Sequence, residues 1–192
     1  PRSGRADCHE HDDHGVRLMA WDFSTEPEFQ KKLDWVDEFC REEIEPLGYV
    51  FPYAVRNPDP KIRELVKGLQ DQIKDQGLWA IFLDEELGGP GYGQLKLGLL
   101  NEIIGRYPTA PQMFGAAAPD TGNMEMLAAY GTDEQKARWL TPMLNQELWS
   151  AYSMTEPQGG SDPNLFKTYA TRDGDEWVIN GEKWFTSAGR VA

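Results

Sequence analysis

The 192-residue sequence predicts an α+β fold, in which an all-helical N-terminal domain is followed by an incomplete antiparallel β-barrel or sandwich domain. Within residues 19–148, apolar residues recur at steps of three and four, the spacing of helices with one buried face. Residues 149–192 instead carry short strand-like runs separated by Gly and Asn turns. Because a few strands can neither close a barrel nor complete a sandwich, we expect the chain to be truncated within its β-domain.

The composition excludes several classes of function. The chain has 19 Lys and Arg against 32 Asp and Glu, a net charge of −13, so most of its surface would repel a nucleic-acid backbone. No run approaches the ~20 apolar residues of a membrane span. The 2 cysteines form no disulfide framework, which favours a reducing cytoplasm.

Residues 1–18 differ from the rest and are predicted to be a disordered tail. The stretch from Cys8 to His14 holds all 3 histidines and could bind a metal ion, but its ligands are crowded and have no rigid frame. We therefore assign no metal site. Because residues 19–192 contain no histidine, a Ser-His-Asp or Cys-His mechanism cannot be built from them.

Pro and Gly delimit the first two predicted helices. Ser24 or Thr25 should cap the first, and residues 46–48 should end it. After a proline-rich link at residues 51–60, a second helix should end at Gly77. The predicted apolar faces comprise Phe29, Leu33, Val36, Cys40 and Ile44 in the first helix and Ile62, Leu65, Val66, Leu69 and Ile73 in the second.

Three further helices should follow an apolar run and a glycine-rich loop. One covers about residues 94–106. Asp120, or the threonine after it, should cap the next, which Gly131 ends. Thr132–Gln135 has the spacing of a capping box, so a short fifth helix should run from there to about Leu140.

The remaining residues predict strands and turns. Asp173–Asp175 is typical of a turn, and Asn180–Gly181 between two strand-like runs is a strong hairpin signal. The predicted strands are residues 149–155, 166–171, 176–180 and 182–187.

The predicted hairpin implies a register for its last strand. Side chains alternate along a strand, so Phe185 and Ser187 should share one face and Trp184 and Thr186 the other. On this basis Trp184 should be a core residue.

Residues 151–162 carry the most chemical information. They predict a strand that enters a glycine-rich turn edged with hydroxyl groups. Paired glycines let a backbone approach a ligand closely, and free N–H groups there suit an anion or a polar ring edge. From the residues alone, such a ligand site and a plain hydroxyl-lined β-turn both remain open.

Two ordered motifs change that balance. Residues 152–157, followed by Gly160–Asp162, and the downstream run Ile179–Ser187 together resemble the signature of the acyl-CoA dehydrogenases, at matching spacing. A weaker similarity covers residues 130–140. Residues 119–124 further resemble the branch that includes acyl-CoA dehydrogenase family members ten and eleven. The resemblance extends over about residues 22–192.

The resemblance implies an FAD site. It places one segment along the flavin ring, a hydroxyl where the flavin pyrophosphate meets the thioester end of acyl-CoA, and a second segment packed on the flavin near N5. Here Phe185 stands for the family's usual Trp and Ser187 for its Thr, which keeps an aromatic face and a hydroxyl. The implied flavin contacts are Tyr152, Ser153, Met154, Thr155, Ser161, Phe185, Thr186 and Ser187, with Ser161 also at the substrate.

The resemblance also implies a reaction. In this family a carboxylate removes the α proton of an acyl-CoA thioester while the β hydride passes to the flavin. The base lies in a C-terminal helical domain, expected beyond Ala192, so no catalytic residue is assigned and the chain alone is expected to be inactive. Further implications are a role in fatty acid β-oxidation, electron-transfer flavoprotein or a similar acceptor, and a homodimer or homotetramer.

Alternatives remain open. A flavin oxidase or monooxygenase of the same fold, or a non-catalytic subunit, would carry similar motifs. Glu156 resembles a catalytic acid, but within this motif we expect it to be structural. Lys183 is expected to be a solvated charge.

Overall fold

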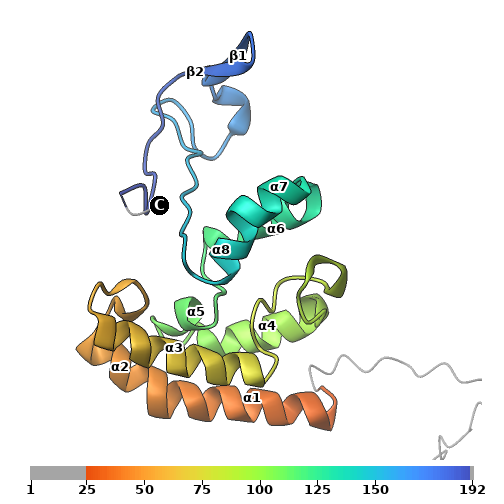
Figure 1. The fold of residues 1–192 in the computed structure, drawn as a ribbon, viewed down its shortest axis with the longest axis vertical. Helices are drawn as coiled ribbons and strands as arrows, with labels where there is room; N and C mark the ends of the chain where they lie inside the picture. Colours follow the sequence, from red (N-terminus) through yellow and green to blue (C-terminus); the bar gives the residue numbers. More distant parts are fainter. Residues whose placement is uncertain (1–24, 191–192) are drawn as a thin grey trace, which may run out of the picture.

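The computed structural model describes residues 25–190 (Figure 1). A body of helices is followed by an extended segment that projects from it, carries a two-stranded antiparallel sheet at its far end and then turns back, which confirms the predicted fold class. The predicted tail with its candidate metal ligands, and the candidate cap Ser24, lie outside the described residues. The helices are α1 Pro27–Phe39, α2 Glu45–Val50, α3 Pro60–Asp75, α4 Gly93–Ile104, α5 Ala110–Met113, α6 Asp120–Tyr130, α7 Asp133–Gln135 and α8 Thr141–Leu144.

Helices α1 and α2 are continuous, joined by the π-helical turn Cys40–Ile44. The predicted end at residues 46–48 is therefore wrong, because the helix runs on to Val50. The wide turn accommodates the proline: the Glu45 N–H bonds to the Cys40 carbonyl five residues back, and Pro46, which has no N–H, follows it. A Cβ at Gly48 would lie 2.7 Å from Thr109 Oγ1, so close packing explains this glycine.

The starts of α1 and α3 differ. Thr25 does not cap α1 as predicted: Glu26 holds the N-cap position, and the Thr25 hydroxyl donates to the Glu26 carboxylate at 2.8 Å. In α3, Asp59 accepts a bond from a first-turn N–H at 2.8 Å. The predicted stop at Gly77 is confirmed, because its backbone has φ +66° and its N–H bonds to the Lys74 carbonyl.

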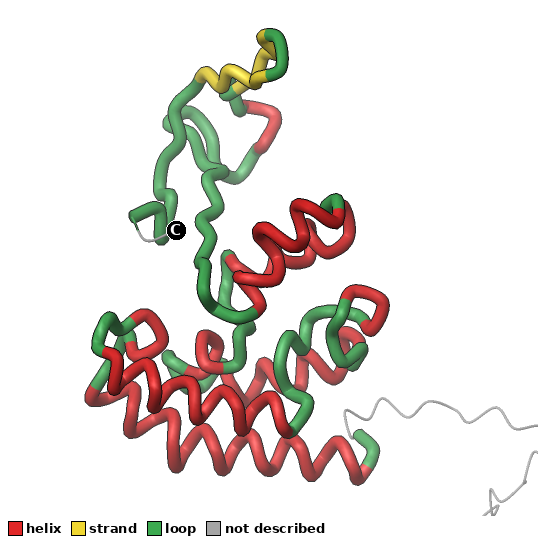
Figure 2. Tube along the Cα trace, in the orientation of Figure 1, coloured by secondary structure: helices red, strands yellow, loops and turns green. Residues whose placement is uncertain are grey.

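The main core lies where α1, α3 and α4 pack together, and Figure 2 shows these helices side by side in the lower body. The predicted faces of the first two helices are largely buried there, except that Leu65 remains 48% exposed. Fully buried members of this core include Val36, Cys40, Ile44, Ile73, Leu78, Leu100, Met113 and Phe114.

No helix within residues 25–190 is both long and apolar enough to cross a membrane.

The apolar run at residues 78–83 joins this core to a second one. It has no regular helix or strand, yet Leu78 and Ile81 are buried in the main core. Ala80 and Leu83 are buried in a smaller cluster formed with α6 and α8. The run therefore works as a buried connection between two packed units.

The later helices also depart from prediction at their ends. Asp120 is not a cap but the first residue of α6, whose N-cap position is held by Pro119 without a side-chain bond. The capping box is confirmed, since Thr132 and Gln135 exchange bonds of 2.9 and 3.2 Å. The helix does not end at Leu140: a second π-helical turn, Lys136–Leu140, again precedes a proline and continues into α8.

Of the four predicted strands, the one at residues 176–180 is confirmed, the one at 166–171 is displaced to 169–173, and the other two are absent from the described residues. β1 Tyr169–Asp173 pairs with β2 Glu176–Asn180 around the predicted turn at Gly174. Residues 149–155 form no strand, because the described residues give them only one backbone–backbone hydrogen bond to another segment, from the Trp184 N–H to the Thr155 carbonyl, and their other partners are side chains.

The predicted hairpin at Asn180–Gly181 is wrong, and residues 182–187 form no strand. Gly181 has φ +152° and passes so close to Thr168 that a Cβ would lie 2.1 Å from its Oγ1. The glycine therefore serves a close crossing of two backbones rather than a two-residue turn.

Candidate functional site

Two segments far apart in sequence lie together beneath the sheet: Tyr152–Thr155 and Trp184–Ser187. The Trp184 N–H donates to the Thr155 carbonyl at 2.7 Å. The hydroxyls of Ser153 and Thr186 lie 2.7 Å apart and share a hydrogen bond. The structure thus joins the two stretches that the sequence predicted to line one cofactor.

A buried carboxylate lies directly behind these segments. The Glu156 side chain is 1% exposed and accepts bonds from the N–H groups of Lys167 and Thr168 at 2.6 and 3.0 Å. It also accepts from Lys183 Nζ at 2.8 Å and from the Gln158 amide. Every donor favours the ionised form.

This environment fixes the charge of Glu156. Burial alone would raise the pKa of the carboxyl, but the bonds from Lys167, Lys183 and Thr168 outweigh it and hold that pKa far below its ordinary value of 4.5. A carboxylate with such a low pKa and saturated acceptor sites is a poor proton acceptor. The geometry agrees with a structural role for Glu156.

Lys183 is not the solvated charge that the sequence predicted. Its side chain is 25% exposed, and its ammonium donates to the Met154 carbonyl and to the Glu156 carboxylate, each at 2.8 Å. The ammonium also lies 4.5 Å from the centre of the Phe166 ring. Its proximity to Glu156, 27 positions away, has no local sequence signal.

The glycine-rich turn is tight. The Glu156 N–H donates to the Gly159 carbonyl at 2.9 Å and the Gly159 N–H donates to the Glu156 carbonyl at 3.1 Å. A Cβ at Gly159 would lie 2.9 Å from Leu165 Cβ. Ser161 follows on the exposed side. Within residues 25–190, neither the Ser161 hydroxyl nor the Ser187 hydroxyl makes a hydrogen bond, so neither hydroxyl takes part in the bonds that join the two segments.

Both segments carry exposed aromatic groups. Tyr152 is 57% exposed and Phe185 is 81% exposed. Phe185 also has φ +56°, an unfavourable backbone for a bulky residue, which proteins tend to retain at ligand sites. Exposed aromatic faces and hydroxyls are the chemical groups that a site for an aromatic ring with polar edges requires.

The same backbone overturns the predicted register. No strand forms here: the Phe185 backbone has φ +56°, and the Ser187 N–H bonds to the Phe185 carbonyl at 2.8 Å in a tight turn. Phe185 and Ser187 therefore do not share a strand face. Trp184 is exposed and packs its ring edge-on against Phe185, with centroids 5.9 Å apart, so it is not a core residue.

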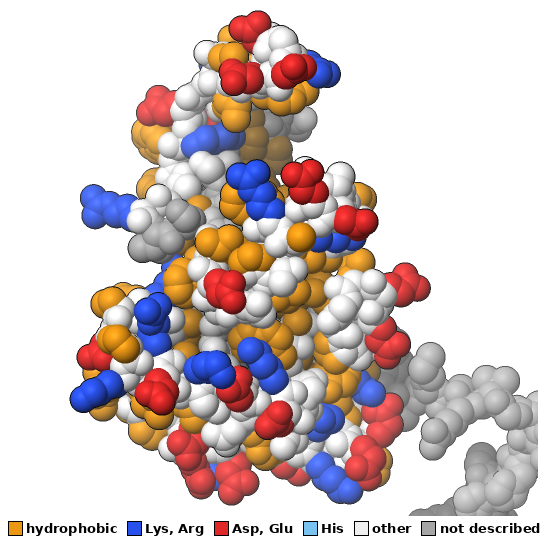
Figure 3. Space-filling view, in the orientation of Figure 1, with side chains coloured by type: hydrophobic (Ala, Val, Ile, Leu, Met, Phe, Trp, Pro, Cys, Tyr) orange, Lys and Arg blue, Asp and Glu red, His pale blue; other side chains and the backbone are white. Residues whose placement is uncertain are grey.

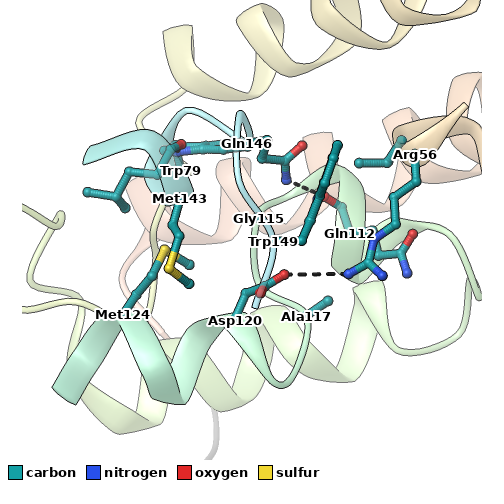
Figure 4. Close-up of a pocket in the computed structure, with 12 residues that line it drawn as sticks. Arg56, Trp79, Gln112, Gly115, Ala117, Asp120, Met124, Met143, Gln146 and Trp149 are labelled. Atoms are coloured by element: carbon teal, nitrogen blue, oxygen red, sulfur yellow. Dashed lines mark hydrogen bonds and ion pairs between the residues drawn. The ribbon is translucent and has the colours of Figure 1, made fainter. Parts of the chain in front are cut away.

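A second polar cluster lies where the extended segment that follows α8 leaves the helical body (Figure 4). The sequence did not predict this cluster. Arg56 and Asp120 lie 3.6 Å apart, and the Arg56 guanidinium lies 5.5 Å from the centre of the Trp149 ring. Asp120 Oδ1 accepts from both the N–H and the hydroxyl of Ser150 at 2.7 Å. The carboxylate thus fastens the start of the segment to α6.

This cluster borders a small cavity of about 20 Å³, enough for about one water. Arg56 Nε faces the buried side and has no partner among the described residues. The Gln146 amide donates to the Gln112 carbonyl at 2.9 Å across the lining (Figure 4). The cavity is too small for a substrate group. Its lining residues instead anchor the start of the extended segment to the helical body.

Comparison with known families gives two matches in chain order. The family model described as the acyl-CoA dehydrogenase N-terminal domain matches residues 26–147. The one described as the acyl-CoA dehydrogenase middle domain matches residues 151–192.

Individual relatives agree. The protein named probable acyl-CoA dehydrogenase FadE2 of Mycobacterium tuberculosis is 38% identical over 91% of this chain and 39% of its own length. Acyl-CoA dehydrogenase family member 11 of Gallus gallus is 41% identical over 82% of this chain and 21% of its own. A solved structure of a candidate acyl-CoA dehydrogenase from Mycobacterium abscessus has TM-score 0.71 and 34% identity, covering 85% of this chain and 43% of that one. The chain thus spans less than half the length of these relatives.

Proposed function

The chain belongs to the acyl-CoA dehydrogenase family, and on that premise we propose that it forms the front part of an FAD-dependent enzyme that dehydrogenates an acyl-CoA thioester between its α and β carbons. The observation that carries this proposal is the hydrogen-bonded pairing of Tyr152–Thr155 with Trp184–Ser187. Within these stretches, the family resemblance assigns Tyr152–Thr155 and Phe185–Ser187 to the flavin, and Trp184 immediately precedes the second group.

The residues present fit an isoalloxazine ring. Tyr152 and Phe185 would offer aromatic faces, while Ser153, Met154, Thr155, Thr186 and Ser187 would offer hydroxyl and backbone groups to its edges. FAD, when bound, would supply the hydride acceptor.

Ser161 would serve both the flavin pyrophosphate and the thioester end of the substrate. Its position after the tight Glu156–Gly159 turn leaves its hydroxyl exposed and free for such a contact. The neighbouring glycines would let the ligand approach the backbone.

The proton-removing base would come from outside the described residues. Glu156 is the conspicuous carboxylate of the motif, but it is buried and bonded to four donors, so its part would be to hold the segments and not to take the substrate proton. A catalytic carboxylate would reach this site from a later helical domain, as in the family.

The proposal extends to partners and place. We expect an acyl-CoA substrate, electron-transfer flavoprotein or a similar acceptor, a homodimer or homotetramer, and a cytoplasmic role in fatty acid β-oxidation. The motif resemblance and the few cysteines support these expectations.

The test uses the natural full-length protein. It should purify with FAD, and anaerobic addition of acyl-CoA esters of different chain length should bleach the flavin absorbance with at least one of them. Oxygen-dependent formation of hydrogen peroxide at the rate of substrate loss would identify an oxidase instead. Full FAD occupancy without bleaching by any ester would favour a non-catalytic subunit.

The chain itself supplies a matched control. The 192-residue chain should show no turnover of any acyl-CoA ester with an artificial electron acceptor, because the expected base is not among its residues. Turnover by the rigorously purified chain would contradict the assignment of the base to a later domain.

A further inference from the structure

We propose that Lys183 and Glu156 form a positioning pair that sets the spacing between the two flavin-facing segments, an inference that rests on the FAD-dependent function proposed above. Neither residue faces the ligand in this scheme. They act through the segments that they join.

Their place in the chain gives the first argument. Glu156 immediately follows Thr155, the last residue of one segment, and Lys183 immediately precedes Trp184, the first residue of the other. A bond of 2.8 Å between Lys183 Nζ and Glu156 Oε1 therefore closes the two segments at their bases. The backbone bond from Trp184 to Thr155 lies directly beside it.

The ammonium group reaches into the first segment as well. Lys183 Nζ donates to the Met154 carbonyl at 2.8 Å, so one side chain from the second segment holds both the backbone and the following carboxylate of the first. Two bonds from one ammonium restrict sliding and rotation of one segment relative to the other.

Glu156 extends the clamp to a third stretch. Its two oxygens accept the N–H groups of Lys167 and Thr168, just before β1. Gly181 crosses Thr168 within a distance that no side chain would tolerate, which brings the chain back toward Glu156 two residues before Lys183. The carboxylate is thus the point where three backbone stretches meet.

Burial explains why this pair should matter more than a surface ion pair. The Glu156 side chain is 1% exposed, whereas the Lys67–Asp71 pair on α3 is largely exposed. Removing one partner of a buried pair leaves an uncompensated charge, while an exposed pair contributes little. All described contacts of Glu156 and Lys183 lie within residues 154–183, so the helical body should not depend on them.

The experiment compares variants of the natural full-length protein. Lys183→Met keeps the length of the side chain without its charge, and we expect it to weaken FAD binding about ten- to a hundredfold. It should also blur the fine structure of the bound flavin's visible spectrum. Lys183→Arg, which keeps the positive charge, should retain most of the parent's affinity for FAD. Lys67→Met is the matched control and should bind FAD as the parent does.

A second variant covers the case in which Lys183→Met fails to fold. Glu156→Gln keeps the shape of the side chain and still accepts one backbone N–H, so it should fold and show the same spectral change with a smaller loss of affinity. In both variants the unfolding midpoint of the helices should stay within about 2 °C of the parent.

The outcomes separate two failures. If the parent binds FAD and both variants keep its affinity within about threefold with an unchanged spectrum, the positioning role is wrong while the proposed function stands. An equal loss of FAD and of helical stability would also overturn it, since the pair would then be a general support of the fold. A parent that binds no FAD would refute the proposed function and the inference with it.

Discussion

In the helical body, residues 25–148, the side chains shielded from water are mostly apolar, whereas in residues 149–190 the one buried side chain is the carboxylate of Glu156. The helices pack around two apolar clusters. The C-terminal segment instead leaves large side chains such as Trp177, Ile179 and Phe185 exposed, and Figure 3 shows hydrophobic groups on its surface.

This difference shows what each region can do alone. Apolar burial is non-directional and stabilises the helical body as a unit. Ordering by one carboxylate is directional: it fixes a few backbone groups at set distances and excludes little water. The first region is thus suited to be a scaffold. The second is suited to hold two short segments in a defined relation, which is the requirement of a cofactor site.

The largest expected effect lies in the scaffold. Phe114 is fully buried in the main core, so Phe114→Ala should lower the free energy of unfolding by about 3–5 kcal/mol. Urea denaturation followed by helical circular dichroism measures this loss. Leu65→Ala, at a half-exposed position on α3, is the control and should cost less than about 1 kcal/mol. Equal losses of unfolding free energy in the two variants would show that Phe114 is no more important to the core than the half-exposed Leu65.

The next prediction concerns the close crossing in the C-terminal segment. A Cβ at Gly181 would lie 2.1 Å from Thr168 Oγ1 and 2.7 Å from its Cα, on a backbone that strains any side chain. Gly181→Ala should therefore destabilise the local structure by about 1–3 kcal/mol and expose residues 181–187 to limited proteolysis. The helical body should be unaffected.

Gly122→Ala is the matched control for that substitution. Gly122 lies within α6 with open space around it, so alanine should leave proteolysis unchanged and should stabilise the helix by about 0.5–1 kcal/mol. If Gly181→Ala proves as harmless, then the crossing is loose and the clamp around Glu156 is weaker than its distances suggest.

A fall in pH should act on the C-terminal segment through Glu156. The folded-state pKa of Glu156 lies below its ordinary value of 4.5, so its stabilising contribution is fully present above pH 4.5 and is lost as the pH falls from there toward the folded value. We expect the amide NMR signals of Lys167 and Thr168 to keep their folded positions at pH 4.5 and to move only in stronger acid. In Glu156→Gln these signals should show no such transition. Movement of the parent signals centred at pH 4.5 would show that Glu156 titrates as an ordinary carboxyl.

Local rules predicted much of the helical body. The capping box of Thr132 and Gln135 and the stop at Gly77 each depend on a few adjacent residues, and both are present. The same rules failed at residues 46–48, because they treat a proline followed by a glycine as a helix end. They do not anticipate a π-helical turn just before the proline, through which the helix continues.

The candidate site was predicted as a set of segments but not as a geometry. Motif resemblance selected both flavin-facing stretches, while the bonds between them depend on contacts across about thirty residues that no local pattern encodes. Asn180–Gly181 misled for the same reason: the dipeptide suits a hairpin, but its glycine is required by a backbone that crosses it from Thr168. Arg56 and Asp120 meet 64 positions apart and had no signal at all.

The smallest expected effects distinguish the two adjacent hydroxyls, Thr186 and Ser187. The Thr186 hydroxyl already shares a bond with Ser153, so Thr186→Val should mainly loosen the contact between the segments. The Ser187 hydroxyl makes no bond within residues 25–190 and is proposed to lie near flavin N5. Ser187→Ala should therefore act on the reductive step itself, slowing flavin reduction about three- to tenfold, as expected for the loss of one neutral hydrogen bond.

The two substitutions should thus separate in their readouts. In the natural full-length protein, Thr186→Val should weaken FAD binding by up to about tenfold with a smaller change in the reduction rate, because its bond orders the site before substrate binds. Ser187→Ala should keep FAD affinity and lose rate. Stopped-flow reduction and FAD titration of both variants decide between them. If Thr186→Val is the slower enzyme at full FAD occupancy, then its hydroxyl and not that of Ser187 serves the flavin, and the turn after Phe185 orients the segment opposite to the proposal.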